Sequence, residues 1–318
     1  MSNYIIKRIL LTIPVIFGIV TITFILLSLV PGDATLCVVG ERVDKVTMEI
    51  IKKERGFDKP IMERYVNYLY RLAHLDLGRS YSTGTQVSKA ICQRFPNTLR
   101  LAVAAMLVAI IVGIPLGILS AIMRGKLIDY ICTFLAVFGV STPVFWFGLL
   151  LICVFSIYLG WLPASGMGNG DIWHLIMPAL TLGLHSVAFI ARVTRSSMLE
   201  VIGENYIRTA RAKGLRESMV ILKHAMKNAL IPVVTLIGLD FGSYLNGSVL
   251  TETIFSWPGI GRYAVEGIMK RDAPVVMGTV LFGAIVFVLA NLIVDILYHF
   301  LNPRIRYSGT KAQRHKGR

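Results

Sequence analysis

The sequence has little charge, and its acidic residues are scarcer than its basic ones. Only 16% of its 318 residues are charged, and 18 acids stand against 33 lysines and arginines, which leaves a formal net charge of +15. Soluble domains carry about 25% charged residues, so this composition argues against an ordinary water-soluble protein. The cations are spread along the chain and no soluble domain collects them, which argues against a nucleic-acid-binding protein.

Patterns of known catalytic and metal sites are also missing. The chain has no Walker A loop, no GxSxG and no HExxH pattern, and its six histidines are scattered. We therefore predict no catalytic residue, no cofactor and no metal site, and we do not expect the chain to hydrolyse a substrate itself. The four cysteines lack metal-site spacing. Cys37 and Cys92 both fall in a predicted outer segment, where a disulfide and two free thiols both stay open.

Long apolar runs are what the chain does contain, since apolar residues make up 55% of it. A helix of about 20 such residues crosses a bilayer core of about 30 Å. We predict an all-α membrane protein with six transmembrane helices, at residues 9–30, 99–123, 130–159, 175–199, 228–250 and 275–301. The first run is too long for a cleavable signal peptide, so it is expected to stay as a helix. Pro143 predicts a kink in the third.

Four parts follow from this pattern. They are a first transmembrane helix at 1–30, an extracytoplasmic helical segment at 31–97, a transmembrane core at 98–303 with a loop at 200–232, and a basic tail at 304–318. The tail is expected to contact membrane lipid or to stay mobile. Apolar spacing predicts helices at 44–55 and 61–74. Most cations of the short loops fall on the side of the N-terminus, whereas the short outer loops hold only Arg262, Lys270 and Arg271. Both termini and the 200–232 loop are therefore predicted to be cytoplasmic.

Glycines recur in the predicted core. Gly113 and Gly117 form a GxxxG pattern in the second helix, and Gly238, Gly242 and Gly247 recur in the fifth. Small residues allow helix backbones to approach closely, so the first pair predicts a packing seam between helices.

The loop at 204–232 reads ENYIRTARAKGLRESMVILKHAMKNALIP. It carries six cations against Glu204 and Glu217, is interrupted by Gly214 and ends at Pro232. A short charged helix with small residues can dock on a partner and move with it, and glycine allows the chain to turn sharply. We predict a docking surface here. The alternative is a solvated basic loop that only sets the topology.

Asp240 is an ionisable residue near the middle of the fifth predicted helix, where a charge is costly and is usually functional. We expect it to face the translocation pathway or another subunit, and the alternative is a structural carboxylate with a partner. Asp295 lies nearer the inner end of the last helix and is predicted to be structural. Further polar surface on the same pathway is expected from Ser243, Asn246 and Asn291.

Several stretches resemble one protein family. YIRTARAKGL at 206–215 and HAMKNALIPVV at 224–234 resemble the cytoplasmic EAA loop of inner-membrane permease subunits in ABC importers. VPGDAT at 30–35, LDLGRSY at 75–81, VGIPLGILSA at 112–121 and NLIVDILYHFLNPRIR at 291–306 agree. The resemblance runs nearly end to end, and it is to the first of the two membrane subunits of the dipeptide, oligopeptide and nickel group. It implies the type I importer fold, a bacterial inner-membrane location and ATP hydrolysis by partner subunits.

The resemblance also implies partners and a coupling helix. The partners are a second homologous permease subunit, two ABC ATPase subunits and an extracytoplasmic solute-binding protein. The EAA loop would form a short helix in a cleft of the ATPase, and the sequence departs from the wider consensus where Arg208 and Thr209 replace a Glu and an Ala. Close approach would be allowed by Ala210, Ala212 and Gly214, with Glu204, Arg208 and Arg211 at the rim.

For residues 251–272 the resemblance implies a re-entrant element near the outer mouth. Proline and glycine at 258, 259 and 261 predict a tight turn, and Trp257 suits a membrane interface. A purely structural corner is the alternative. Contacts to the outer gate or the solute-binding protein are then predicted for Glu252, Trp257, Pro258, Gly259 and Arg262.

Two further function classes were weighed against the importer. A secondary transporter that uses Asp240 and Asp295 as ion sites is disfavoured because the sequence has no inverted repeat and has the organised loop. A membrane enzyme would need an acid, base or metal set that the chain lacks. Within the importer class, peptides are the predicted substrate, and the resemblance leaves nickel complexes and glutathione as alternatives.

Overall fold

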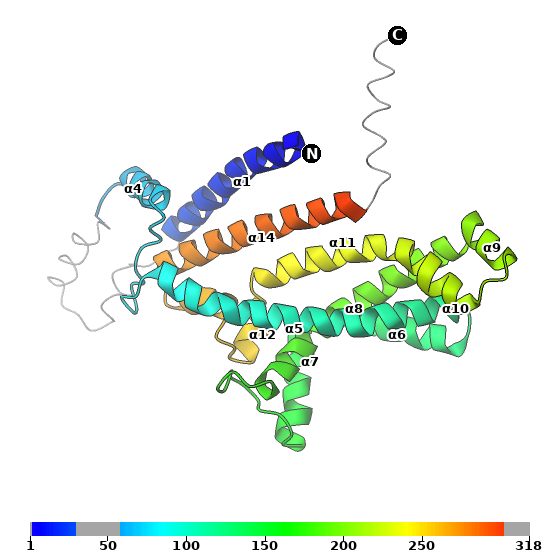
Figure 1. Cartoon of the computed structure of the whole chain (residues 1–318). Helices are drawn as coiled ribbons and strands as arrows, with labels where there is room; N and C mark the ends of the chain where they lie inside the picture. Colours follow the sequence, from blue (N-terminus) through cyan, green and yellow to red (C-terminus); the bar gives the residue numbers. More distant parts are fainter. Residues whose placement is uncertain (1, 30–57, 302–318) are drawn as a thin grey trace, which may run out of the picture. The chain divides into compact units, whose positions relative to one another are not determined.

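The computed structural model describes residues 2–29 and 58–301. This part of the chain is almost entirely helical (Figure 1), and within it the only strand-like pairing is an isolated bridge between Arg79 and Gln86. The predicted helix at 44–55, the thiol of Cys37 and the basic tail lie outside the described residues, as does the side chain of Asp295.

Long helices account for most of the described chain. The first five are α1 (Ser2–Leu29), α4 (Ile61–Ala73), α5 (Val87–Ile122), α6 (Leu127–Ser141) and α7 (Val144–Leu151), the last continued by a π-helical turn at Ile152–Tyr158. Then come α8 (Trp173–Ile202), α9 (Asn205–Ala212), α10 (Glu217–Met219), a second π-helical turn at Val220–Ala225 and α11 (Met226–Leu245). The chain continues through α12 (Val249–Ile254), α13 (Ile260–Met269) and α14 (Ala273–Leu301).

Within the described residues, five helical runs are long and apolar enough to cross a bilayer: Leu10–Leu29, Val87–Ile122, Trp173–Ile202, Glu217–Leu245 and Ala273–Val294. A sixth span results if Leu127–Ser141 and Val144–Tyr158 count as one broken span, and these two helices meet at 103°. The predicted break at Pro143 is confirmed and is sharper than a kink. Thr142 and Pro143 both adopt extended backbone conformations, because a proline disfavours helix at the residue before it.

Two predicted boundaries are wrong. Helix α5 starts at Val87 and not at residue 99, because Val87 and Ile91 on its first turns are buried in a cluster with Ile260 and Val275. The fifth span runs from Glu217 to Leu245 and not from 228 to 250. Pro232 therefore lies inside α11, and the non-helical part of the loop predicted at 200–232 is shorter than expected.

The end of α11 is set by Gly247. Its φ of +91° lies in the left-handed region, and a Cβ atom there would lie 2.8 Å from the backbone nitrogen of Gly261. A helix cannot continue through this conformation, so α12 starts as a separate helix two residues later.

The chain forms two compact units, which we describe separately. The first comprises residues 1–99 and 245–288. In it α4 packs on α1, where Phe24 lies 5.2 Å from Tyr65 between ring centroids and the hydroxyl groups of Thr21 and Tyr65 are 2.7 Å apart. The predicted helix at 61–74 is thus confirmed within one residue.

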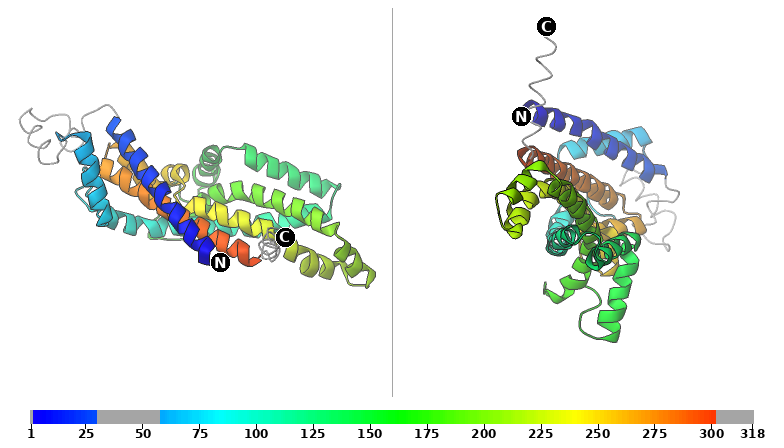
Figure 2. Two further views of the ribbon diagram at one scale, coloured as in Figure 1. Left: turned by 90° about the horizontal axis from the view of Figure 1, so that it is seen from above. Right: turned by 90° about the vertical axis from the view of Figure 1, so that its right-hand side faces the viewer.

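The second unit comprises residues 100–244 and 289–318, and α8 is its most buried span. Helix α8 lies along α5 and α6 (Figures 1 and 2). The predicted glycine seam is confirmed, because a Cβ atom at Gly113 would lie 3.0 Å from Ile190, and one at Gly117 would lie 2.5 Å from the Cβ of Thr194. The glycines let α5 and α8 approach closely.

Candidate functional site

A short helix connects the end of α8 to the start of α10. We call residues 203–216 the coupling segment, and α9 is its helical part. Ile207 and Ala210, three residues apart, are buried in an apolar cluster with Met198 of α8 and Val220. This spacing places both on one helical face. The opposite face is exposed and carries Arg208, Thr209, Arg211 and Ala212.

The exposed face contains most, but not all, of the residues that the resemblance assigned to coupling. Glu204 precedes the helix, is exposed and accepts the backbone N–H of Ile207 at 3.1 Å through its carbonyl oxygen. Ala210 differs from the other residues of this set, because it packs inside its own chain. The reason is helical spacing, since a residue that shares a face with Ile207 must follow it into the core. We call the exposed residues Glu204, Arg208, Arg211, Ala212 and Gly214 the coupling face.

Gly214 ends α9 by its backbone conformation and not by crowding. Its φ is +74°, and no heavy atom would lie within 4 Å of a Cβ atom there. Glycine adopts this left-handed conformation readily, whereas it is unfavourable for other residues. The sharp turn predicted at this position is present.

Polar contacts join α9 to the helix that follows it. The Arg211 guanidinium donates to both carboxylate oxygens of Glu217, at 2.6 and 3.1 Å. Both side chains are about half exposed, so this pair adds less than about 1 kcal/mol. The side-chain amide of Asn228 on α11 donates to the hydroxyl group of Tyr206 at 2.8 Å. With the apolar cluster, these contacts connect α9 to both α8 and α11.

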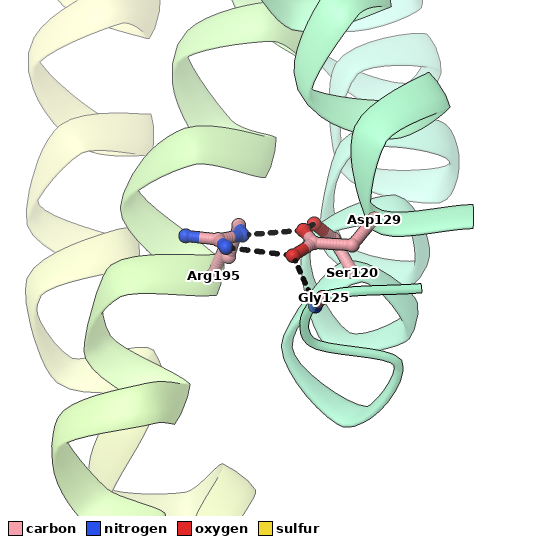
Figure 3. Close-up of polar contacts among 4 residues, drawn as sticks. All are labelled: Ser120, Gly125, Asp129 and Arg195. Atoms are coloured by element: carbon pink, nitrogen blue, oxygen red, sulfur yellow. Dashed lines mark hydrogen bonds and ion pairs between the residues drawn. The ribbon is translucent and has the colours of Figure 1, made fainter. Parts of the chain in front are cut away.

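A buried ion pair holds α8 to the turn between α5 and α6 (Figure 3). Arg195 donates from Nε and Nη2 to the two oxygens of Asp129 at 2.8 and 2.9 Å. Ser120 Oγ donates to the same carboxylate at 2.5 Å, and the backbone N–H of Gly125 donates at 3.0 Å. Asp129 is only 5% exposed, so four donated hydrogen bonds replace its water.

This ion pair was not predicted as a site from the sequence. The sequence did contain a clue to this pair. Asp129 and Arg195 are ionisable residues in apolar helices, and such residues usually have a partner or a function. The sequence does not say which of the many cations would pair with Asp129.

Asp240 lies on α11, half-buried, and faces α8 of its own chain. Ser186 Oγ donates to Asp240 Oδ2 at 2.7 Å, Ser186 also hydrogen-bonds the hydroxyl group of Tyr244, and that hydroxyl donates to the carbonyl of Leu182 at 3.1 Å. Asp240 is five residues before the end of α11, about 8 Å by helical rise, so its predicted place at mid-span is wrong. The cause is the early end of the helix at Leu245.

The structure brings only part of the predicted polar pathway together. Ser243 follows Asp240 by one helical turn and is exposed. Asn246 is exposed just after α11, and Asn291 is half-buried on α14. Asn246 belongs to the first unit and Asp240 to the second, and in the described part of the chain no hydrogen bond joins Asn291 to Asp240.

The turn between α12 and α13 packs against the N-terminal half of α5. Glu252 is fully buried and accepts hydrogen bonds from Thr98 Oγ1 at 2.8 Å and from the backbone N–H of Arg262 at 3.0 Å. Trp257 is also fully buried, and its Nε1 donates to the carbonyl of Asn97 at 3.0 Å. Asn97 in turn donates to the carbonyl of Pro258 at 3.0 Å.

The burial of these residues bears on the contacts predicted for them. Glu252, Trp257 and Gly259 are buried within their own chain, so in this structure they are not exposed to a second protein. Gly259 is required because a Cβ atom would overlap the Glu252 carboxyl group. Pro258 and Arg262 stay partly exposed, and Arg262 pairs with Glu266 at 2.9 Å. The structure favours the structural corner for most of this turn.

Known proteins that resemble this chain identify the family to which this architecture belongs. Residues 113–307 match the model of the binding-protein-dependent transport system inner membrane component, and residues 1–102 match the N-terminal model of the same transport systems. The dipeptide transport system permease protein DppB of Escherichia coli K12 is 42% identical, with 96% of this chain and 99% of DppB covered. The glutathione transport system permease protein GsiC of Pectobacterium atrosepticum is 44% identical, with 96% of this chain and 100% of GsiC covered.

A solved structure shares the fold. A chain of the inward-facing MetNI methionine ABC transporter superposes with a TM-score of 0.57 at 19% identity, covering 68% of this chain and 97% of that chain. The predicted all-α, type I importer permease fold is confirmed, and the chain is a multi-pass inner-membrane protein. On these matches, which span nearly its whole length, the chain belongs to the family of binding-protein-dependent transport system inner membrane components.

Proposed function

We propose that this ABC importer permease subunit forms one half of the translocation pathway for dipeptides and oligopeptides and couples to its ATPase subunits through the coupling face of residues 204–214. The observation that carries the proposal is the two-faced α9. One face is fixed in the chain's own apolar cluster, and the other presents arginines, Ala212 and Gly214 to the outside. An anchored helix with an exposed small-residue edge can transmit a partner's movement as a rigid body.

The path for that movement starts from α9. Its buried face packs against Met198, on the last turns of α8, and Arg195 one turn earlier is held to Asp129. A displacement of α9 would therefore move α8 and the turn between α5 and α6 together. Asp240 hydrogen-bonds Ser186 on the same α8, so the pathway proposed for Asp240, Ser243, Asn246 and Asn291 includes a residue attached to this helix.

The remaining partners belong to the same proposal. A second, homologous permease subunit would complete the pathway, two ATPase subunits would hydrolyse ATP, and a solute-binding protein would deliver substrate from outside. The charges of the short loops support cytoplasmic termini and a cytoplasmic coupling segment. The division into 1–30, 31–97, 98–303 and 304–318 is proposed on the same basis.

Peptide as substrate is supported by the similarity to DppB, a dipeptide transport system permease, and glutathione is the second candidate because GsiC is similarly close in sequence. The two candidate substrates, dipeptides and glutathione, are both short peptides with free carboxylates. Uptake of labelled dialanine and labelled glutathione should be compared in proteoliposomes that contain this chain, its companion permease, both ATPases and the solute-binding protein.

Coupling is tested by Ala212→Trp, which adds bulk at an exposed position and leaves the core unchanged. We expect loss of ATPase co-purification and of ATP-driven uptake. Ala73→Trp on α4, also at an exposed alanine, is the matched control and should preserve both. Full uptake by the Ala212→Trp complex would refute the coupling role. Uptake driven by an ion gradient without ATPases would instead favour a secondary transporter.

A further inference from the structure

A cavity of about 360 Å³ lies in the first unit, between the first turns of α5, the end of α13 and the start of α14. This volume falls within the range of small-ligand sites. It is separate from the coupling face and from Asp240. The charged and aromatic residues that line it are Lys89, Arg94, Tyr263, Glu266, Lys270 and Asp272.

Charge in the cavity is unbalanced. Lys89 and Lys270 are exposed, and neither has an ion pair in the described part of the chain. Glu266 is already neutralised by Arg262. Asp272 is buried and accepts hydrogen bonds from Ser80 Oγ at 2.6 Å and the Ser82 backbone N–H at 3.0 Å. With Arg94, the cavity therefore has three cations against one carboxylate that lacks a cationic partner.

Within the described part of the chain, two residues that line the cavity each carry a buried hydrogen-bond donor without an acceptor. The guanidinium carbon of Arg94 lies 4.5 Å from the ring centroid of Tyr263, and the buried Nε of Arg94 has no hydrogen-bond partner. Tyr263 is only 7% exposed, and its buried hydroxyl group also lacks a partner. Burial raises the pKa of Tyr263, so the hydroxyl keeps its proton. Buried donors of this kind usually have partners, and an acceptor on a ligand would provide one.

We propose that this cavity binds a short peptide by its terminal carboxylate, which Arg94, Tyr263 and Lys270 hold. A carboxylate supplies acceptors only, and it therefore matches donors that have no acceptor of their own. The surrounding hydroxyl and amide groups suit a peptide backbone, and they include Ser82, Thr85, Gln86 and Gln93. That the carboxylate belongs to a peptide rests on the proposed function, whereas the carboxylate itself rests on the donors of the cavity.

The chemistry is tested by direct binding to the purified permease–ATPase complex, without the solute-binding protein and without nucleotide. The probes are dialanine, dialanine with an amidated C-terminus, and inorganic phosphate, each titrated calorimetrically. We expect dialanine to bind at least about tenfold more tightly than its amide, because the amide adds donors and removes the charge. Equal affinity of the two peptides would overturn the proposal. Preferential binding of phosphate would assign the cavity to phosphate and overturn the peptide assignment.

Substitutions of residues that line the cavity test whether the peptide binds there. Lys270→Gln removes an exposed cation without an ion pair, and Tyr263→Phe removes only a hydroxyl group and keeps the ring beneath Arg94. Each should weaken dialanine binding about fivefold to tenfold. Arg71→Gln on α4 changes an exposed cation outside the cavity and should leave affinity unchanged. Unchanged affinity in an assembled Lys270→Gln complex would show that the peptide binds elsewhere, contrary to the proposal.

Uptake distinguishes this proposal from the proposed function. A complex that transports dialanine with ATP, but binds it identically in wild type and Lys270→Gln, supports the importer and refutes the cavity. A complex that shows the predicted binding differences but no ATP-driven uptake supports the carboxylate cavity and refutes the importer function.

Discussion

Arg195 on α8 holds Asp129 at the first turn of α6 through two parallel hydrogen bonds of 2.8 and 2.9 Å, although the residues are 66 positions apart in the sequence. Ser120 near the end of α5 donates to the same carboxylate. Three helices are thus fastened at one point, close to the end of α8 that leads into the coupling segment. Buried charges of this kind stay only where their geometry and additional donors are complete.

The first prediction concerns this pair. Arg195→Gln would leave the buried Asp129 carboxylate without its cation, and we expect the complex to lose about 2–3 kcal/mol of stability. The loss falls below the values for fully buried pairs because the Arg195 side chain is 32% exposed. The stability of Arg195→Lys should lie between that of the wild type and that of Arg195→Gln, since an ammonium group cannot make both hydrogen bonds in the same plane. Melting temperature in detergent measures the effect.

The matched control for that pair is Arg192→Gln, which removes an exposed cation from the same helix. It should leave the melting temperature within about 1 °C, since surface substitutions are usually within ±0.5 kcal/mol. If Arg195→Gln melts at the same temperature as Arg192→Gln, the ion pair does not hold these helices together.

A second prediction tests the contact between α5 and α8. Gly117→Ala places a methyl group 2.5 Å from the Cβ of Thr194, and we expect a loss of about 1–3 kcal/mol from overpacking. Gly18→Ala on α1 is the control, because no heavy atom lies within 4 Å of a Cβ there. The control should stay neutral or gain slightly from the removal of glycine flexibility. Equal melting temperatures for the two variants would mean that the seam is not tightly packed.

Local patterns in the sequence predicted the parts of the fold that depend on local rules. The spacing of Gly113 and Gly117 gives a seam wherever a second helix packs, and Pro143 breaks a helix regardless of its neighbours. The length of the apolar runs predicted the transmembrane spans. It also predicted the wrong end for the fifth helix, because the conformation of Gly247 depends on the close approach of Gly261, which follows α12 in the sequence.

The candidate sites were harder to predict because their partners are distant in the sequence. From the sequence alone, Glu252 and Trp257 are expected to be exposed turn residues. In the structure they are buried and hydrogen-bond Thr98 and Asn97, which lie more than 150 positions earlier. Ala210 resembles an exposed small residue until Ile207 fixes which face of α9 is buried. No pattern within one segment identifies a contact that the fold makes between two segments.

A third prediction follows from the buried Glu252. Burial raises the pKa of Glu252 above the ordinary glutamate value, so the folded state retains a proton that the unfolded state releases. Stability from this group is therefore greatest at low pH and falls as the pH rises through the window between the two pKa values. The Glu252→Gln variant carries no such proton, and its melting temperature should rise relative to wild type between pH 5 and pH 8.

The comparison of the two proteins at each pH cancels the other titrating groups. Because Gln mimics the protonated acid, the two melting temperatures should converge at the acidic end. A constant difference across the range would mean that Glu252 titrates normally, and that the donors from Thr98 and Arg262 offset its burial.

The fourth prediction concerns the turn that ends the coupling segment. Gly214→Val introduces a β-branched side chain at a φ of +74°, which costs about 1–2 kcal/mol or more and should shift the turn after α9. We expect the variant to remain folded, since no heavy atom lies within 4 Å of the new Cβ, but to lose ATPase docking and uptake. Gly214→Asn should retain more activity, because asparagine tolerates this conformation better.

The control for Gly214 separates conformational strain from the coupling role. Gly160 has a φ of +63°, also has open space around its Cβ position, and lies outside the coupling segment. Gly160→Val should therefore lower the melting temperature by a similar amount while ATP-driven uptake persists at the same protein level. If Gly160→Val abolishes uptake as completely as Gly214→Val, then general strain explains both variants. Selective loss at Gly214 would instead show that the direction of the chain leaving α9 decides whether the ATPase can engage it.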